Sequence, residues 1–303
     1  MQQLRVRVTA RPVFAAAAPW IFVLLWSTGF IGARFGLPYI EPFTFLLIRF
    51  LIAAGLLAAI SLALRAPWPR PAQLGHIAVV GLLLHAGYLG GVFFAIDHGM
   101  SAGVSSLIVS LQPILTAVIA QLALREPVAG RQWIGLVLGF AGAGMVLAEK
   151  MLAPGAAGTG ITGATLAAAL IALLSTTSGT LYQKRYGGGM PLTTGTCIQY
   201  LAAAVVMLAG SFVFEQRAIT WAPQLFFAMG WLVFVLSLGA ILLLMTLIRV
   251  SSAARVSSLF YLVPPATAFE AYLIFGERFG PLALGGLALA SLGVALVVAP
   301  TTH

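Results

Sequence analysis

Long apolar stretches, separated by short polar connections, run through the whole chain. Ten of them approach about twenty residues, the length at which a helix crosses about 30 Å of hydrocarbon. None alternates polar and apolar residues as membrane barrel strands do, and hydrocarbon admits only helices or closed barrels. We therefore predict an all-α polytopic membrane protein. The ten expected transmembrane helices lie at 16–35, 43–63, 76–96, 102–124, 132–148, 161–182, 192–214, 222–248, 255–275 and 281–299.

Composition supports a membrane protein without a soluble catalytic domain. Of the 303 residues, 61% are hydrophobic and 8% are charged, against about 25% charged in ordinary globular domains. The longest connection, 149–162, is a Gly/Pro/Ala-rich turn segment. The single cysteine, Cys197, excludes an intrachain disulfide and a multi-cysteine metal site. We expect neither a metal nor a cofactor.

The net charge of +9 indicates how the chain is oriented in the membrane. Its cations are spread between the apolar stretches and form no patch for nucleic acid. With the N-terminus inside, eleven basic residues fall on one side of the membrane and four on the other. The positive-inside rule then places both termini in the cytoplasm. Arginine far outnumbers lysine and alanine is abundant, which suits a GC-rich bacterium and hence its inner membrane.

The chain repeats itself once. The segment VSSL at 104–107 recurs at 256–259, Pro113 matches Pro265 at the same spacing, and the glycine-rich helices that follow also match. Further matches pair Glu126 with Glu277, Gly135 with Gly286, Gly142 with Gly293, Pro42 with Pro191, and STG at 27–29 with TSG at 177–179. The repeating unit is five helices, which gives halves at 1–150 and 151–303. Because five is odd, the second half enters the membrane inverted, and such repeats place a substrate site near the midplane between them.

Several segments together resemble a known family. They are WSTGFIGARFGLPYIEPFTFLLIRF at 26–50, the REP and GERF turns at 125–127 and 276–279, and the glycine-rich segments at 135–148 and 285–299. The chain resembles the EamA-type ten-helix branch of the drug/metabolite transporter superfamily, closest to its YddG-like amino-acid exporters. The resemblance covers the whole chain and implies a transporter. The second half departs from the first in having Thr176 where the first has Trp26.

Polar side chains inside the apolar stretches are the candidate substrate contacts, because such groups are costly in hydrocarbon and face the bundle interior. His85 lies near the middle of the third stretch, with Tyr88 on the same face. The alternative is a neutral histidine that bonds a neighbouring helix, and small hydroxyls also join helices without touching substrate. The predicted substrate-binding residues are Trp26, Ser27, Thr28, His85, Tyr88, Ser110, Gln112, Thr176, Ser178, Tyr182, Met245 and Tyr261. They predict a broad cavity among helices one, three, four, six, eight and nine.

Two prolines and two charged residues are the predicted gating elements. Pro113 and Pro265 lie inside predicted helices, where proline removes a backbone hydrogen bond and produces a kink or local unwinding. The alternative is a static kink. Arg49 and Glu270 are equally deep, about 8 to 9 Å from the outer helix ends at about 1.5 Å per residue. This depth permits a structural pair or an external gate.

The glycine-rich fifth and tenth stretches predict a different role. Gly135 and Gly139 form a GxxxG pattern that Gly142 and Gly144 extend. Small-residue faces let helix backbones pack closely. We assign them to the scaffold or to a contact between copies, so the protein is expected to be a monomer or a homodimer.

The function that the resemblance implies is outward transport of small metabolites, amino acids in particular, and the inverted repeat predicts that it proceeds by alternating access. An intramembrane enzyme is disfavoured because HExxH, a membrane aspartate pair and a catalytic serine motif are missing. A channel would show rings of like charge or a carbonyl filter. None of the seven acids is central, so we expect an uncoupled carrier. The alternative is a proton-coupled exporter that uses His85. The expected partners are a small-molecule substrate and membrane lipid, not nucleic acid.

Overall fold

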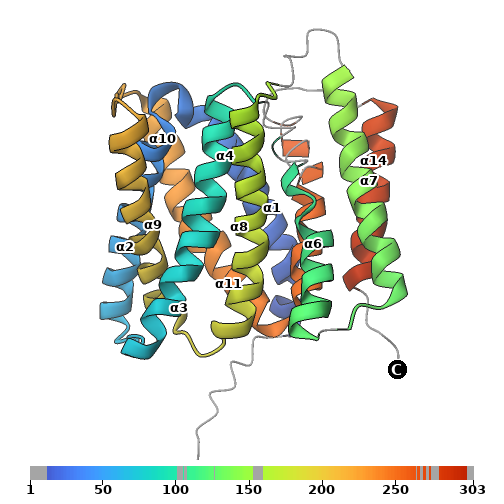
Figure 1. The fold of residues 1–303 in the computed structure, drawn as a ribbon, viewed down its shortest axis with the longest axis horizontal. Helices are drawn as coiled ribbons and strands as arrows, with labels where there is room; N and C mark the ends of the chain where they lie inside the picture. Colours follow the sequence, from blue (N-terminus) through green and yellow to red (C-terminus); the bar gives the residue numbers. More distant parts are fainter. Residues whose placement is uncertain are drawn as a thin grey trace, which may run out of the picture.

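Helices run up and down through the molecule, roughly side by side, in a computed structural model (Figure 1). The structure describes residues 12–100, 105, 108–125, 127–152, 160–263, 265–266, 269–270, 273 and 280–298. The first half contains α1 (Pro12–Gly36), η1 (Leu37–Tyr39), α2 (Pro42–Ala63), α3 (Pro71–Gly81), η2 (Leu82–Gly87), α4 (Tyr88–Asp97), α6 (Gln112–Ile119), η3 (Ala120–Leu124) and α7 (Gly130–Leu152). The second contains α8 (Gly163–Tyr186), α9 (Leu192–Phe214), α10 (Pro223–Trp231), η4 (Leu232–Ala240), α11 (Ile241–Val250), α12 (Ala253–Ser258), η5 (Leu259–Leu262) and α14 (Pro281–Val298).

The predicted all-helical class is confirmed for the part of the chain that the structure describes, where an isolated bridge between Ile40 and Ile219 is the sole strand-like pairing. Helix is present in each of the ten predicted stretches. Among the described residues, six segments are long and apolar enough to cross a membrane, so the protein is a multi-pass membrane protein. They are Pro42–Ala63, Pro71–Asp97, Gly163–Tyr186, Leu192–Phe214, Pro223–Val250 and Pro281–Val298. The number of ten spans stays a prediction.

The two ends of the bundle are distinguished by the elements that meet there. At the upper end in Figure 1, α1 and α4 end and α10 begins. At the lower end, α8 and α11 end and α3 begins.

Helices pack in a pattern that is the same when the two halves are exchanged. α2 packs on α9, and α7 packs on α14, and each of these pairs joins equivalent helices of the two halves. α4 packs on α8, while α1 packs on α10 and η4. These two contacts also correspond, since each joins the first helix of one half to the third helix of the other.

Glycines bring α7 and α14 into close contact. A Cβ on Gly142 would lie 2.6 Å from the Gly286 oxygen, and one on Gly293 would lie 2.6 Å from the Gly135 oxygen. The residue numbers rise along one helix and fall along the other, so the helices are antiparallel. Since the repeat matches Gly135 with Gly286 and Gly142 with Gly293, the two contacts are copies of one another. The predicted glycine faces therefore serve as scaffold within one chain.

A carboxylate from α7 caps the N-terminus of α14. Glu149, near the end of α7, accepts hydrogen bonds from the backbone N–H groups of Gly280 (2.6 Å) and Ala283 (2.9 Å). Such bonds satisfy donors that have no partner inside the helix. The bond from Ala283, together with that from Gly280, lowers the pKa of Glu149 because both favour the ionised carboxylate.

Each half contains a π-helical segment at the same place in its third membrane helix. η2 connects α3 to α4, and η4 connects α10 to α11. π-Helical turns are rare in proteins, and those that occur are frequently near functional sites. η2 contains His85 and η4 contains Ser237, and both side chains enter the polar contacts described below.

The helix interruption predicted near Pro113 is present. Ser110 and Leu111 form a turn, and α6 begins at Gln112, so Pro113 occupies the first turn of a new helix. Proline is tolerated there because the N–H it lacks would be unpaired in any case. Pro265 is helical and buried, and it follows shortly after the 3-10 segment η5 in the chain. Other predicted landmarks lie outside the described residues: Glu126, Glu277 and, apart from Ser105, the segment 104–107.

Candidate functional site

A cavity lies between α1, α2, α4 and the junction of η4 with α11. α4 contributes one face of its helix, from Tyr88 to Ile96, and α1 contributes the face from Trp26 to Ala33. Because Ala33 and Ile96 lie near the upper ends of their helices, the cavity extends from the bundle interior toward the upper end. It is lined mainly by apolar side chains, and Arg49 is the single charged group among its described lining residues.

Stacked aromatic rings form one wall of the cavity. The rings of Trp26 and Tyr88 lie 6.4 Å apart and are nearly parallel, at 6°. Behind Trp26, the ring of Phe260 packs edge-on at 5.4 Å and the ring of Phe22 lies 5.2 Å away. Trp26 is 7% exposed, so packing holds its ring in one orientation. Two of the predicted substrate contacts, Trp26 and Tyr88, thus share the cavity wall.

Arg49 reaches the cavity from α2 and has a neutral partner. Its Nε donates a hydrogen bond of 2.9 Å to the Ser237 hydroxyl in η4. Arg49 and Glu270 do not form the pair that their equal depth permits, because a Glu270 carboxylate oxygen instead accepts a 2.5 Å hydrogen bond from Ser27 in α1. Equal depth in the membrane did not bring the two charges together, because they face different neighbours around their helices.

His85 lies outside the described lining of the cavity and is fully buried. Its Nε2 is 3.3 Å from the Gln199 side-chain oxygen in α9, and the Gln199 amide donates at 3.4 Å to the Gln183 oxygen in α8. The rings of Phe50 and Tyr200 pack beside it, at 5.9 and 4.6 Å. This is the contact between helices that the alternative interpretation of His85 expects.

The two polar contacts correspond under the repeat. Phe50 of α2 and Tyr200 of α9 stack on one another at 5.5 Å, and Arg49 and Gln199 directly precede these two rings in the chain. Ser237 likewise lies within one turn of the position equivalent to His85. The Arg49–Ser237 contact between α2 and η4 therefore has a counterpart, the Gln199–His85 contact between α9 and η2. The first is charged and the second is neutral.

Other predicted site residues have structural partners away from the cavity. The Gln112 amide donates to the Thr180 hydroxyl at 3.2 Å, which joins α6 to α8. Thr28 accepts a hydrogen bond of 2.9 Å from the Trp231 indole N–H in α10. Tyr182 contacts His76 at 2.7 Å near the lower end.

The remaining predicted residues are core or surface positions. Met245 and Tyr261 are fully buried and absent from the cavity lining, so they fill the core. The Tyr261 ring lies against Gly139, where it occupies the space of a missing side chain. Ser178 is exposed on α8, whereas Thr176 and Ser110 are buried and neither lines the cavity. The described cavity therefore uses helices one, two, three and eight of the predicted order, and helix two was not expected.

Basic side chains close the lower end. The Lys184 ammonium donates to the backbone oxygens of Ile248 (3.3 Å) and Ser251 (2.5 Å) where α11 ends. Arg249, also near that end, donates to the Met190 oxygen. Cations are favourable at helix C-termini, where carbonyl groups lack partners. α8 and α11 are held together there.

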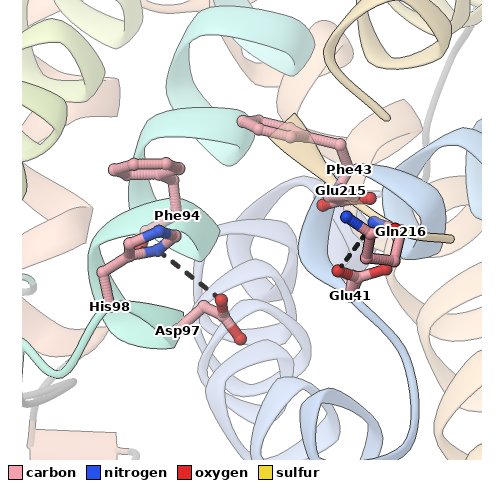
Figure 2. Close-up of polar contacts among 7 residues, drawn as sticks. All are labelled: Glu41, Phe43, Phe94, Asp97, His98, Glu215 and Gln216. Carbon is pink, nitrogen blue, oxygen red and sulfur yellow. Dashed lines mark hydrogen bonds and ion pairs between the residues drawn. The ribbon is translucent and has the colours of Figure 1, made fainter. Parts of the chain in front are cut away.

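Acidic side chains fix the rim of the upper end (Figure 2). Glu41 accepts hydrogen bonds from the backbone N–H groups of Gln216 (3.1 Å) and Ala218 (2.9 Å), and Glu215 accepts one from that of Thr44 (2.8 Å). These hydrogen bonds join the start of α2 to the end of α9. Across the rim, Asp97 lies 3.5 Å from the His98 ring. These carboxylates are thus occupied as helix caps and rim contacts.

Sequence reasoning missed the polar residues opposite Arg49 and His85. Ser237 and Gln199 are single polar residues within long apolar runs, and that isolation is the signal that would have found them. Thr180 and Gln183 are less conspicuous, because they lie near the polar end of the sixth stretch.

Comparison with known proteins gives consistent results. The sequence matches the EamA-like transporter family twice, over residues 13–148 and 163–299. It is 30% identical over 283 residues to an uncharacterized transporter, YvbV, of Bacillus subtilis (strain 168), covering 91% of this chain and 88% of that protein. It is 28% identical to an uncharacterized inner membrane transporter, YedA, of Escherichia coli (strain K12), over 94% of this chain and 91% of that one.

Two further similarities are more distant. A probable amino-acid metabolite efflux pump of Salmonella typhimurium (strain LT2) is 25% identical, with 90% of this chain and 91% of that protein covered. A chain in a solved crystal structure superposes with a TM-score of 0.75 at 20% identity, covering 94% of this chain and 96% of that chain. The structural match supports the fold alone.

Proposed function

Since the chain belongs to the EamA-like transporter family, we propose that it exports amino acids of several side-chain types across a bacterial inner membrane. Both termini are cytoplasmic in this proposal, so the upper end faces outward. The observation that carries it is the apolar, aromatic cavity of α1, α2 and α4, whose single charged group is Arg49. Aromatic and aliphatic walls with few polar groups suit ligands that share a head group and differ in their side chains.

The mirrored packing supports alternating access. The cavity opens between elements of both halves toward the upper end, while Lys184 joins the equivalent elements at the lower end. Inverted halves that pack through equivalent contacts can exchange these two arrangements at small cost, because each half then adopts the conformation of the other. A carrier of this kind exposes the cavity to one side at a time.

Counterflow in proteoliposomes tests this function. Liposomes that contain the full-length protein and are loaded with an unlabelled amino acid should take up the same labelled amino acid in a saturable manner. Protein-free liposomes are the control. Non-saturating flux would indicate a channel, and failure to exchange any amino acid tested would contradict the proposed substrate class.

We expect transport without proton coupling. No carboxylate is among the described lining residues of the cavity, and His85 lies outside that lining. An imposed pH gradient without a substrate gradient should therefore produce no accumulation, and His85→Ala should keep downhill exchange. Accumulation that collapses with a protonophore would contradict this expectation.

Proton-coupled export is the second candidate, and two buried atoms favour it. His85 Nδ1 and a Glu270 carboxylate oxygen are buried and have no hydrogen-bond partner in the described chain. The other Glu270 oxygen bonds Ser27, next to Trp26 in the cavity wall. Loss of accumulation in His85→Ala would assign the proton site to the histidine, and loss in Glu270→Gln would assign it to the carboxylate.

A further inference from the structure

We propose that Arg49 is the receptor for a carboxylate group of the transported molecule. The substrates are then small organic acids, amino acids among them, that place the carboxylate at Arg49 and the apolar body against Trp26 and Tyr88. The inference rests on the proposed transport function and assigns the chemical group that its cavity recognises. It also gives Arg49 a different role from the structural pair or gate that its depth in the membrane suggests.

The first argument is the missing counter-charge. Arg49 is 4% exposed, and its only hydrogen bond within the described chain runs from Nε to the neutral Ser237 hydroxyl. The described residues place no carboxylate within ion-pair distance of it, and Glu270 is bonded to Ser27 instead. A buried charge with no counter-charge is costly, and an arriving anion offsets that cost. The guanidinium keeps its charge at neutral pH and still has N–H donors to offer.

The second argument is where those donors lie. Arg49 is part of the cavity wall, together with Trp26 and Tyr88. None of its nitrogen atoms is among the buried polar atoms that lack a partner, so the unbonded nitrogens keep some accessible surface at the cavity wall. Ser237 holds the guanidinium through Nε, which leaves the terminal nitrogens to bind a ligand. The geometry thus resembles a prepared receptor more than a packed core charge.

The third argument selects a carboxylate among anions. The planar guanidinium binds the two oxygens of a carboxylate side by side, with charge-assisted hydrogen bonds. A phosphate carries a second charge, and the described wall provides no second cation to meet it. The remaining wall is aliphatic and aromatic, which suits the uncharged body of a small organic acid.

The second half of the chain suggests the informative variant. Gln199, which precedes Tyr200 as Arg49 precedes Phe50, makes the corresponding contact in the second half, from α9 to His85 in η2. Glutamine is thus compatible with this fold at this place. Arg49→Gln removes the charge and keeps a hydrogen-bonding side chain. Arg49→Lys keeps the charge and removes the side-by-side hydrogen bonds. Arg217→Gln makes the same chemical change at an exposed loop position and is the matched control.

Ligand binding to the purified full-length protein is the test, followed as the ligand-dependent rise in unfolding temperature. The three probes share a phenyl group: L-phenylalanine, 3-phenylpropanoate and 2-phenylethylamine. We expect both carboxylates to stabilise the parent protein at millimolar concentration and the amine to have no effect. Arg49→Gln should raise the half-saturating concentration of both carboxylates about 10- to 100-fold, the effect of losing a charged hydrogen bond. The half-saturating concentration for Arg49→Lys should lie between those of the parent and Arg49→Gln. That for Arg217→Gln should match the parent.

Three results would overturn the inference: carboxylate binding by Arg49→Gln within twofold of the parent, equal binding of the amine, or no binding of either carboxylate to the parent. The three-probe comparison on the parent does not depend on any variant folding. Counterflow of phenylalanine separates this inference from the proposed function. If Arg49 binds carboxylates but no amino acid is exchanged, the proposed function fails. If amino acids are exchanged and Arg49→Gln exchanges them normally, this inference fails.

Discussion

Gly142→Val should prevent stable assembly of α7 with α14. A Cβ at Gly142 would lie 2.4 Å from the Ala290 nitrogen and 2.6 Å from the Gly286 oxygen, both of them backbone atoms. Backbone cannot move aside as a flexible side chain can, so the two helices must separate along their whole contact. Overpacking in a tight core costs about 3 kcal/mol, and lost contact along α14 adds to that. We expect a large fall in unfolding temperature and in the yield of folded protein.

Gly144→Val provides the matched control for this prediction. Gly144 lies on the same helix, and a Cβ there meets nothing within 4 Å. The change in residue type and in intrinsic helix propensity is therefore the same in both variants. Equal unfolding temperatures for the two variants in detergent would show that the close helix contact does not stabilise the protein.

Trp26→Ala should produce the second large effect, on transport. The indole forms the cavity wall with Tyr88 and packs against Phe22 and Phe260. Its removal takes away an aromatic surface for the substrate and lets Tyr88 turn. An aromatic contact contributes about 0.5 to 1.5 kcal/mol beyond its buried area, so the KM for exchanged amino acids should rise about tenfold or more.

Trp20→Ala tests whether this effect belongs to the cavity. Trp20 lies on the same helix and is 60% exposed, so its loss should leave KM unchanged. Trp26→Phe should recover part of the affinity, because it restores an aromatic ring. An unchanged KM in Trp26→Ala, with folded protein of normal yield, would contradict a substrate role for this wall.

Hydropathy and the internal repeat predicted the parts of the fold that depend only on position along the chain. Apolar length indicates where a helix can cross hydrocarbon, so each predicted stretch contains helix. The repeat matched Gly135 with Gly286 and Gly142 with Gly293, and these four residues do form the α7–α14 contact. Small residues show their role in sequence because only close backbone approach requires them.

The partners of the charged residues were not predictable in the same way. Depth along a helix can be counted, but the direction of a side chain around the helix depends on packing. Arg49 therefore turned out to face Ser237, and Glu270 to face Ser27. The π-helical segments η2 and η4 make the problem harder, because each extra residue in a turn rotates everything beyond it. Sequence periodicity does not report such a turn.

The predicted site residues lie in different environments for a related reason. Trp26 and Tyr88 line the cavity, because large aromatic residues in the first and third helices meet across it. Met245 and Tyr261 belong to the same residue classes but are buried in the core. Residue type alone does not separate a cavity wall from a packed interior, because both are apolar and aromatic.

Accessibility of the cavity from each side of the membrane tests the central claim most directly. Leu89 lines the cavity on α4, and the single cysteine, Cys197, is buried and can be replaced by serine, which keeps a donor for the Ala54 oxygen. In that background, Leu89→Cys should react with an impermeant thiol reagent added outside right-side-out vesicles. A saturating amino acid that the same vesicles exchange should slow this labelling several-fold. Labelling at an unchanged rate while exchange proceeds would show that substrate does not pass through this cavity.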